Sequence, residues 1–486
     1  MNATALRERL EAVVGRDGVV TGSADLLLYQ YDASDEAIAG INRPDVVVLP
    51  RTAEQVAAIV RIAREAGVPV TPRGAGTGLA GGALAARGGI MIVLTRMNRV
   101  LEISEDDRYA IVEPGVINLD LSQTTSPRGY FFAPDPSSQR ACTIGGNIAN
   151  NSGGPHCLKY GVTSNHILGV EVVLPSGEMV WTGGAAPESP GIDLTGVLVG
   201  SEGTLGIVTK AMVRLTRNPE AINVLVAAFP DIESASHTVS AIIAAGILPA
   251  ALEMMDALTI KAVEAAYHAG YPEDAGAVLL VEIDGLAEAV AESSEMIVTI
   301  CRQHGASDVR VASSAEERAL LWQGRKAAFG AMGRLAPNYY LQDTVVPRTK
   351  LPATLRRVEE IGREYKLQIA NVFHAGDGNL HPLILFDRYR VGDIERVLNA
   401  GSEMLHWSVN VGGAISGEHG IGLEKKDHIA LIFTPDDLAA MAGLKMSFDP
   451  LQYFNPEKVF PTGFSCGEVA ALKQQALLEK PNIHVA

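Results

Sequence analysis

Cysteines are few in this sequence, and no two of them have the spacing of a metal-binding motif. The four, Cys142, Cys157, Cys301 and Cys466, form no Cys-x-x-Cys pair. This gives little support for an iron–sulfur cluster or a structural zinc site. The simplest interpretation is a reduced, cytoplasmic protein.

Long hydrophobic runs are also absent. No run of about 18 apolar residues occurs, so we expect no membrane-spanning helix. The first residues, "MNATALRERLEAVVG", contain no apolar core of the kind a secretory signal needs. Any peripheral association with the inner membrane is therefore left to a partner protein.

Basic residues are outnumbered by acidic ones. The 40 Lys and Arg residues against 56 Asp and Glu residues give a net charge of −16. Non-specific nucleic-acid binding needs a basic surface, so this balance argues against it. Hydrophobic content of 47% and charged content of 20% are ordinary for a soluble globular protein.

The chain's length and the change in its sequence pattern near residue 218 predict more than one domain. A chain of 486 residues is too long for one hydrophobic core. The first part is rich in glycine, whereas strand and helix patterns alternate after about Asn218. We therefore expect domains at 1–217 and 218–445, and a turn-rich segment at 446–486 that packs back on the first domain.

A glycine-rich stretch follows a predicted strand in the first domain. "GTGLAG", Gly76 to Gly81, matches the dinucleotide-binding pattern G-x-G-x-x-G. A Rossmann unit needs a crossover helix next, but only "GALAARGG" precedes the next strand, which disfavours that fold. The glycines still allow backbone N–H groups to approach a phosphate closely. The alternative is a tight turn without a ligand.

A second long segment, 130–161, shows few periodic apolar residues. Loops of this length without regular structure are uncommon and are often functional. The stretches "PDPSS" and "TIGGNIANNSGG" offer backbone donors, hydroxyls and amides, which suit a pyrophosphate and a polar heteroaromatic ring. Either stretch alone would be an ordinary polar loop.

Two histidines flank a turn in "NVFHAGDGNLHPLILF". Asp-Gly between apolar runs is a strong hairpin signal. A two-residue turn at Asp377-Gly378 would place His374 directly opposite His381, with Cβ atoms roughly 4.5–5.5 Å apart. Such imidazoles could bind one metal ion, or they could form a hydrogen-bonded structural pair.

Six motifs in order carry a resemblance to a known family. They are "PRGAGTGLAGG", "PDPSSQRACTIGGNIANNSGG", "HCLKYGVT", "GSEGTLGIVT", "NVFHAGDGNLHP" and "ISGEHGIG". The pattern resembles the FAD-linked 2-hydroxyacid dehydrogenases of the vanillyl-alcohol-oxidase superfamily, and most closely the FAD-binding D subunits of bacterial glycolate oxidases. The resemblance implies an α+β fold, with an N-terminal FAD-binding domain and a C-terminal substrate domain that contains an antiparallel sheet.

The resemblance also implies which residues hold FAD. Those expected at the pyrophosphate are Arg73, Gly74, Ala75, Gly76, Thr77, Gly78 and Gly81. Those expected around the flavin ring are Pro134, Asp135, Ser137, Thr143, Gly146, Asn147, Asn151, Glu202, Gly206 and Ile207. Relatives with covalent flavin carry histidine where this chain has Thr77, so we expect non-covalent FAD.

For the chemistry, the resemblance implies metal ligands at His374, His381 and Glu418. It makes His419 the base and Arg325 the group that binds the substrate carboxylate. Zinc and manganese both suit this ligand set, which is also found in non-haem iron oxygenases. Without its context, Glu418 would be an exposed loop carboxylate and Arg325 a surface charge.

The expected reaction is oxidation of a short 2-hydroxy acid, glycolate or D-lactate, to the 2-oxo acid. Members that oxidise D-2-hydroxyglutarate carry a lysine near the strand "YYLQDTVVP", which this chain lacks. The alternatives are a D-2-hydroxyglutarate dehydrogenase and a non-catalytic FAD-binding support subunit. The implied partners are a second flavoprotein and an iron–sulfur subunit, within a homodimer or a hetero-oligomer.

Overall fold

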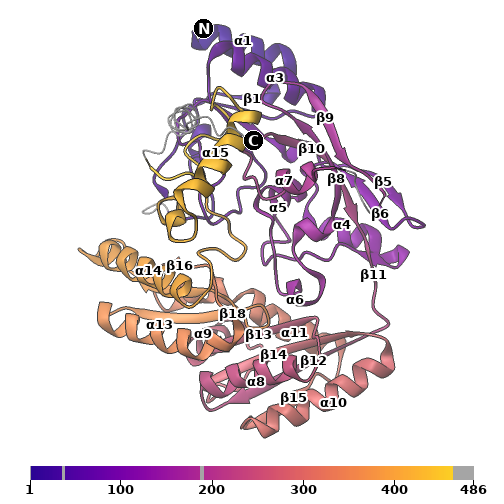
Figure 1. Cartoon of the computed structure of the whole chain (residues 1–486), viewed down its shortest axis with the longest axis vertical. Helices are drawn as coiled ribbons and strands as arrows, with labels where there is room; N and C mark the ends of the chain where they lie inside the picture. Colours follow the sequence, from indigo (N-terminus) through magenta and orange to yellow (C-terminus); the bar gives the residue numbers. More distant parts are fainter. Residues whose placement is uncertain (1, 36–38, 187–190, 463–486) are drawn as a thin grey trace, which may run out of the picture.

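Two α+β bodies lie one above the other in the computed structural model, which describes residues 2–35, 39–186 and 191–462 (Figure 1). Residues up to about 217 and the last described helix, α15 (Pro435–Phe448), form the upper body, and the elements between them form the lower one. The part of the 446–486 segment beyond residue 462 lies outside the described residues.

The first sheet of the upper body has the strand order β1-β2-β4-β3. Its strands are β1 (Val19–Val20), β2 (Val46–Val48), β4 (Ile90–Val93) and β3 (Val70–Arg73), and it is covered by α1 (Ala3–Val14) and α3 (Ala53–Ala66). Thr52 caps α3 by accepting a hydrogen bond from the Gln55 N–H, 3.3 Å away.

The glycine-rich stretch connects two parallel neighbours in this sheet. β3 pairs with β4 in parallel. The intervening residues 74–89 form turns and bends, and they are long enough to return the chain without a helix. This parallel pair is therefore connected without a crossover helix, and the fold is not a Rossmann unit.

A second, antiparallel sheet completes the upper body. Its order is β5 (Val100–Ser104), β6 (Tyr109–Val112), β10 (Ile207–Arg214), β8 (Ile167–Val173) and β9 (Met179–Gly183). The surrounding elements are α4 (Asn118–Thr125), α5 (Ile144–Asn150), α6 (Cys157–Tyr160), α7 (Leu194–Leu198) and the ribbon of β7 (Tyr130–Phe131) with β11 (Thr216–Arg217). The segment 130–161 is thus less irregular than predicted, because α5 and α6 interrupt it.

The lower body contains a large antiparallel sheet. Its order is β15 (Asp308–Val311), β12 (Ala221–Phe229), β14 (Ala277–Gly285), β13 (Ala251–Asp256), β18 (Gln368–His374), β19 (Asn379–Leu380) and β17 (Thr344–Val345). In addition, β20 (Pro382–Phe386) pairs with both β18 and β16 (Asn338–Leu341).

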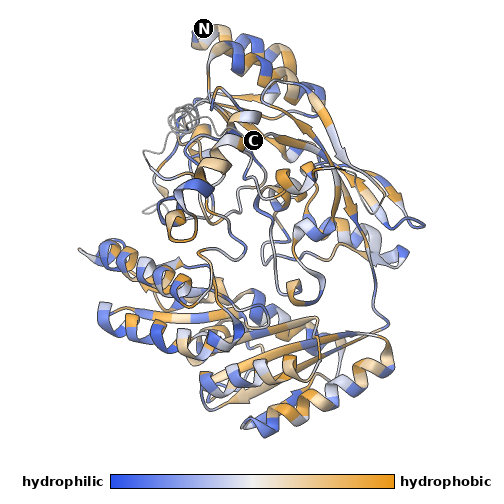
Figure 2. Cartoon of the chain, in the orientation of Figure 1, coloured by the Kyte–Doolittle hydropathy of each residue, from blue (hydrophilic) through white to orange (hydrophobic). Residues whose placement is uncertain are grey.

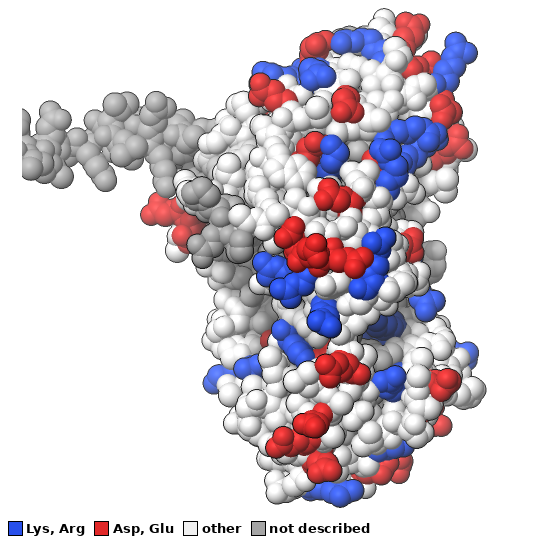
Figure 3. All heavy atoms as spheres, turned by 90° about the vertical axis from the view of Figure 1, so that its right-hand side faces the viewer, with Lys and Arg blue, Asp and Glu red and all other residues white. Residues whose placement is uncertain are grey.

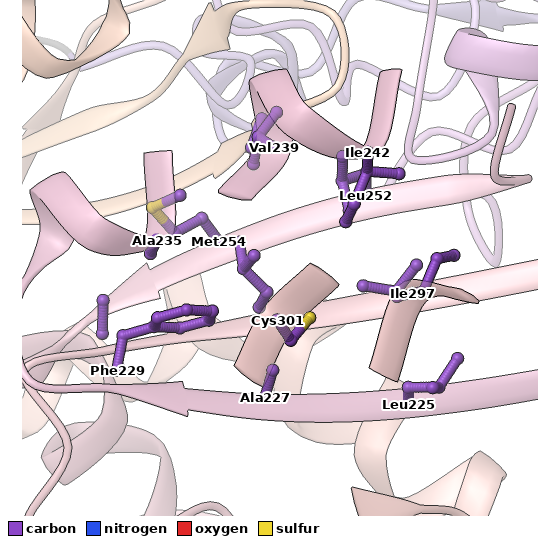
Figure 4. Close-up of a cluster of buried hydrophobic side chains, with 14 of the residues drawn as sticks. Leu225, Ala227, Phe229, Ala235, Val239, Ile242, Leu252, Met254, Ile297 and Cys301 are labelled. Atoms are coloured by element: carbon purple, nitrogen blue, oxygen red, sulfur yellow. The ribbon is translucent and has the colours of Figure 1, made fainter. Parts of the chain in front are cut away.

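Helices cover both faces of this sheet, which explains why its central strands are mainly apolar. Leu225 and Phe229 of β12 pack with α8 (Ile232–Ala244), α10 (Ala287–Gln303) and the start of α13 (Leu351–Tyr365) (Figure 4). Alternate residues of β12 face α9 (Ala257–Tyr267), α11 (Ala315–Lys326) and α12 (Ala328–Ala331). The orange strands and two-coloured helices of Figure 2 show the same division.

The last described elements return to the upper body. After α14 (Asp393–Asn410) and α15 (Pro435–Phe448), Phe454 forms a bridge with Val70 of β3 and is fully buried beside α3. Lys445 of α15 donates hydrogen bonds to the Asp449 carboxylate and to the Thr204 carbonyl, each 2.6 Å away. The described end of the chain is therefore part of the upper core.

Figure 3 shows basic and acidic side chains interspersed over one face of both bodies, with no extended basic surface on that face. Among the described residues, no helix combines the length and the apolar composition needed to cross a membrane.

The Lys445–Asp449 pair gives a prediction of stability. We expect Lys445→Met to lower the free energy of unfolding by about 3 kcal/mol, because it leaves a buried carboxylate without its cation. Thermal unfolding followed by circular dichroism measures the effect. The control Lys350→Met, at an exposed position, should change stability by at most about 0.5 kcal/mol. Equal midpoints for the two variants would contradict this role of Lys445.

Candidate active site

A cavity of about 500 Å³ lies between the two bodies. This volume is typical of small-molecule sites. The lower body contributes four lining residues, Lys326, Phe329, Glu418 and His419. From the upper body, the predicted residues that line it are Arg73, Gly74, Ala75, Gly76, Thr77, Gly78, Ser137, Thr143, Gly146, Asn147, Glu202, Gly206 and Ile207.

Four predicted FAD residues lie outside the cavity wall. Gly81 packs against Leu423, and the Pro134 carbonyl accepts a hydrogen bond from Asn118, 2.8 Å away. Asn151 ends α5 in a left-handed conformation. Asp135 forms an ion pair with His156, 3.0 Å away. At these positions the four residues stabilise the loops that form the cavity wall.

The glycine loop has no room for a side chain at Gly76 and leaves the cavity open at Gly78. At Gly76, where φ is +73°, a Cβ atom would lie 2.1 Å from the Arg73 guanidinium. At Gly78, which lines the cavity, nothing lies within 4 Å of a Cβ position. Among the described residues, the buried Nδ2 of Asn147 has no hydrogen-bond partner. Open backbone and an unpaired donor suit a phosphate-containing ligand such as FAD.

The histidine hairpin differs from its prediction in register. His374 pairs with Asn379, not with His381, because the turn has four residues, 375–378. Asn371 pairs with Pro382, which continues the same register. The shift is of two residues, so both histidines keep the same face of the sheet. Their rings still meet edge to face, with centroids 5.1 Å apart.

The three predicted metal ligands converge. Oε1 of Glu418 lies 3.4 Å from Nε2 of His374 and 3.2 Å from Nε2 of His381. One ligand atom from each of the three lies within 4.8 Å of the others. His381 is only 1% exposed, and neither ring nitrogen has a hydrogen-bond partner among the described residues. This donor set fits a divalent cation.

The pKa values of these groups follow from the charges around them. Burial opposes ionisation of Glu418, but His374 and His381 hold its pKa well below the usual range. Burial also favours a neutral His374, but Glu253 outweighs it and raises the pKa of His374 to about 10. Two carboxylates, Glu253 and Glu418, therefore lie beside the ring of His374.

Glu253 is a site residue that the sequence did not reveal. It lies directly opposite His374 on β13, and Nδ1 of His374 is 2.8 Å from its carboxylate. A carboxylate behind a ligand histidine fixes the ring and its tautomer. The one available signal was an acid within the apolar run of the strand "ALEMMD".

Arg325, which was predicted to bind the substrate carboxylate, is buried beside Glu253, and its Nε and Nη2 have no hydrogen-bond partner among the described residues. Its side chain is 1% exposed, does not line the cavity, and forms an ion pair with Glu253 at 2.5 Å. The structure thus does not bring Arg325 to the cavity wall. Instead, a buried chain of contacts runs from Arg325 through Glu253 to His374.

A second unpredicted carboxylate, Asp343, shapes the loop that carries Glu418 and His419. Its Oδ2 accepts hydrogen bonds from the backbone N–H groups of Gly417, Glu418 and His419 at 2.9, 3.2 and 3.0 Å, and from the Ser416 hydroxyl at 2.7 Å. Asp343 is fully buried. Oδ2 of Asp343 therefore fixes the conformation of the loop.

Glu202 holds the same loop from the upper body. Its carboxylate accepts hydrogen bonds from the N–H groups of Ile421 and Gly422 at 2.7 and 2.8 Å. Burial raises the pKa of Glu202. Although it lines the cavity, Glu202 also anchors the Glu418–His419 loop to the FAD-binding side.

His419 reaches the cavity wall, where its ring stacks on His381 with centroids 5.0 Å apart. Burial and the neighbouring His381 lower the pKa of His419 to about 4, although Asp343 opposes them. A neutral imidazole at neutral pH can accept a proton. Glu418 thus contacts the two ligand histidines, and His419, the next residue, lies at the cavity wall.

Comparison with known proteins identifies this arrangement. Residues 44–183 match the FAD binding domain family, and residues 218–459 match the family of FAD linked oxidases, C-terminal domain. Glycolate oxidase subunit GlcD of Escherichia coli (strain K12) is 47% identical over 430 residues, which cover 88% of this chain and 86% of the relative.

More distant relatives share the same architecture. A D-lactate dehydrogenase of Anaerostipes hadrus is 34% identical, covering 88% of this chain and 92% of the relative. The solved structure of p-cresol methylhydroxylase with substrate bound, 18% identical, superposes with a TM-score of 0.81 over 95% of this chain and 98% of that one. This chain belongs to the FAD-linked oxidases of the vanillyl-alcohol-oxidase superfamily, and it is an FAD-dependent oxidoreductase.

Proposed function

We propose that this enzyme oxidises a short 2-hydroxy acid, glycolate or D-lactate, to the corresponding 2-oxo acid. The observation that carries the proposal is the convergence of His374, His381 and Glu418. Of these groups Glu418, together with His419, lines the cavity that the glycine loop also lines. The names of the relatives, glycolate oxidase subunit and D-lactate dehydrogenase, support the same substrate class.

In this proposal, a ring nitrogen of His419 takes the proton of the substrate hydroxyl. Bound FAD supplies the acceptor for the hydride that leaves C2. A divalent cation, zinc or manganese, held by His374, His381 and Glu418 would acidify the hydroxyl. Glu253 keeps the His374 ring in place, and Asp343 holds His419 at the cavity wall.

A short substrate is favoured over a dicarboxylate. Leu383, near the position where hydroxyglutarate members place a polar group, is fully buried in the core of the lower body. The strand β16 brings Tyr340, not a lysine, toward Glu424, with the Tyr340 hydroxyl 2.9 Å from that carboxylate. The complete metal-ligand set argues against a support subunit without catalysis.

We further propose that the enzyme acts as a subunit, passing electrons to a second flavoprotein and an iron–sulfur partner. The name of the Escherichia coli relative supports subunit status. Cys142, Cys157 and Cys301 are free, and among the described residues no cysteine joins a metal-ligand group. A cytoplasmic location, with peripheral membrane contact through partners, fits this arrangement.

Anaerobic flavin reduction tests the reaction. We expect glycolate or D-lactate to bleach the flavin spectrum faster than D-2-hydroxyglutarate does. His419→Ala should slow bleaching by about 10²- to 10⁴-fold, the usual effect of losing a general base. The control His406→Ala, at an exposed position on α14, should leave the rate unchanged. A wild-type flavin that none of these acids bleaches would refute the proposed reaction.

Metal analysis tests the ligand set. We expect purified enzyme to carry a divalent metal that is lost in His381→Ala. Glu253→Gln should weaken metal binding by about 10- to 100-fold, because it removes the carboxylate behind His374. Competition with a coloured chelator measures both. Glu171→Gln, which disrupts a pair with Lys210 in the upper body, should bind metal as the wild type does.

Acid precipitation tests the FAD linkage. Because Thr77 stands where covalent relatives have histidine, we expect acid to release all the flavin into the supernatant. The absorbance of the supernatant and the pellet measures the partition. Yellow colour that stays with the precipitated protein would contradict non-covalent binding.

A further inference from the structure

The carboxylate of Asp343 has two oxygens, and the loop that carries Glu418 uses only one of them. Oδ2 accepts the hydrogen bonds of that loop, whereas Oδ1 is buried and has no hydrogen-bond partner among the described residues. A buried acceptor without a donor costs free energy, and such groups are rare in native proteins. Oδ1 therefore needs a donor that the loop does not supply.

His381 offers this donor. Its Nδ1 lies 3.8 Å from Oδ1 of Asp343, and it too is buried without a hydrogen-bond partner among the described residues. The two residues are 1% and 0% exposed, so water does not reach the space between them freely. A neutral imidazole carries one proton, on either Nδ1 or Nε2. An approach of about 0.8 Å would bring the two facing atoms to hydrogen-bond distance.

The other charged neighbour of Asp343 is already engaged elsewhere. The Lys425 ammonium donates to the backbone carbonyl of Asp343 at 2.7 Å, and it lies 3.6 Å from Oδ2 of the carboxylate. It therefore balances the charge of Asp343 on the side of the oxygen that holds the loop. Oδ1 is left facing the imidazole.

The second ligand histidine shows the same arrangement at a shorter distance. Nδ1 of His374 lies 2.8 Å from the Glu253 carboxylate, while its Nε2 lies 3.4 Å from Oε1 of Glu418. In His381, Nδ1 faces Asp343 and Nε2 lies 3.2 Å from the same Glu418 oxygen. Each ligand histidine thus has a carboxylate behind it and turns its Nε2 toward the ligand set. A ligand histidine commonly donates its other N–H to a carboxylate in this way.

We propose that Oδ1 of Asp343 accepts the Nδ1 hydrogen of His381 and so keeps the lone pair of Nε2 for the cation. Asp343 is then a positioning residue for two of the three ligands, because Oδ2 orders the loop of Glu418 and Oδ1 orients His381. This inference rests on the proposed function, in which the three ligands hold a divalent cation.

A competing explanation is that Oδ1 serves His419. One ring nitrogen of His419 lies within 4.8 Å of both Asp343 and His381, and its ring lines the cavity. His419 is not a ligand in the proposed site. A contact of Asp343 with His419 alone would therefore change turnover without changing the affinity for metal, which separates the two explanations.

Asp343→Asn distinguishes the two oxygens. The amide oxygen can take the place of Oδ2 and keep the hydrogen bonds from the loop, which need an acceptor. The amide NH2 then takes the place of Oδ1 and faces His381 as a donor. A donor there favours the tautomer of His381 with its proton on Nε2, the atom that the cation needs. The change thus acts on the ring while the loop keeps its acceptor.

The experiment uses the full-length protein, loaded with FAD and stripped of metal. The affinities for zinc and for manganese are measured by competition with a coloured chelator. The variants are Asp343→Asn, His381→Ala and the double variant, each checked for its FAD content and thermal midpoint. Ser416→Ala is the matched control, because its hydroxyl donates to Oδ2 of Asp343 at 2.7 Å and leaves Oδ1 untouched.

We expect Asp343→Asn to weaken metal binding by about 10- to 100-fold, the usual effect of losing the partner behind a ligand histidine. In the His381→Ala background the same change should weaken it less than about threefold, because the residue through which Asp343 acts is gone. Ser416→Ala should also weaken it less than about threefold, since three backbone N–H donors still hold the loop.

Equal losses from Asp343→Asn in both backgrounds would overturn the proposal, since Asp343 would then act through the loop of Glu418. An equal loss in Ser416→Ala would overturn it for the same reason. Slower turnover of Asp343→Asn with unchanged metal affinity would overturn it in favour of the contact with His419.

A crystal structure of the zinc-loaded wild type is a second test, which does not depend on the folding of a variant. We expect Nδ1 of His381 within about 3.2 Å of Oδ1 of Asp343. A separation that stays beyond about 3.5 Å with the cation bound would overturn the proposal. If the wild type binds neither zinc nor manganese, the proposed metal site itself fails. That outcome is separate from a failure of the variants.

Discussion

The active site depends on one buried interaction, the carboxylate of Asp343 surrounded by N–H groups of the loop that carries Glu418 and His419. Three successive backbone donors and the Ser416 hydroxyl point at one oxygen. A loop of this composition, with glycine on both sides, has many conformations when unbound. A fixed negative charge at its centre selects one of them, and this brings Glu418 to the two histidines while His419 reaches the cavity.

The same loop explains how two bodies form one site. Its earlier residues are held by Asp343 of the lower body, whereas Ile421 and Gly422 donate to Glu202 of the upper body. Each carboxylate is buried, so each interaction is strong in the absence of competing water. The loop is thus fixed at both ends by carboxylates from different bodies. Movement of one body against the other would therefore displace His419.

The sequence predicted the fold class, and most of the residues it predicted to hold FAD line the cavity, because these depend on local patterns and motifs. Glycine loops and the hairpin signal are readable within a few residues. By contrast, the contact of Glu253 with His374 joins residues 121 apart through the pairing of β13 with β18. No local pattern specifies which strands become neighbours, so carboxylates behind the ligands were missed. The pair of Arg325 with Glu253 was missed for the same reason, because Glu253 lies on that distant strand.

The histidine hairpin shows why a prediction can be wrong in detail and still locate the right residues. The turn has four residues instead of two, which moves the pairing of His374 from His381 to Asn379. Side chains alternate between the faces of a strand, so only an odd shift would have separated the histidines. An even shift changes their spacing along the ladder but not their face. Convergence then required a third element, the loop ordered by Asp343, which brings Glu418 to the diagonal pair.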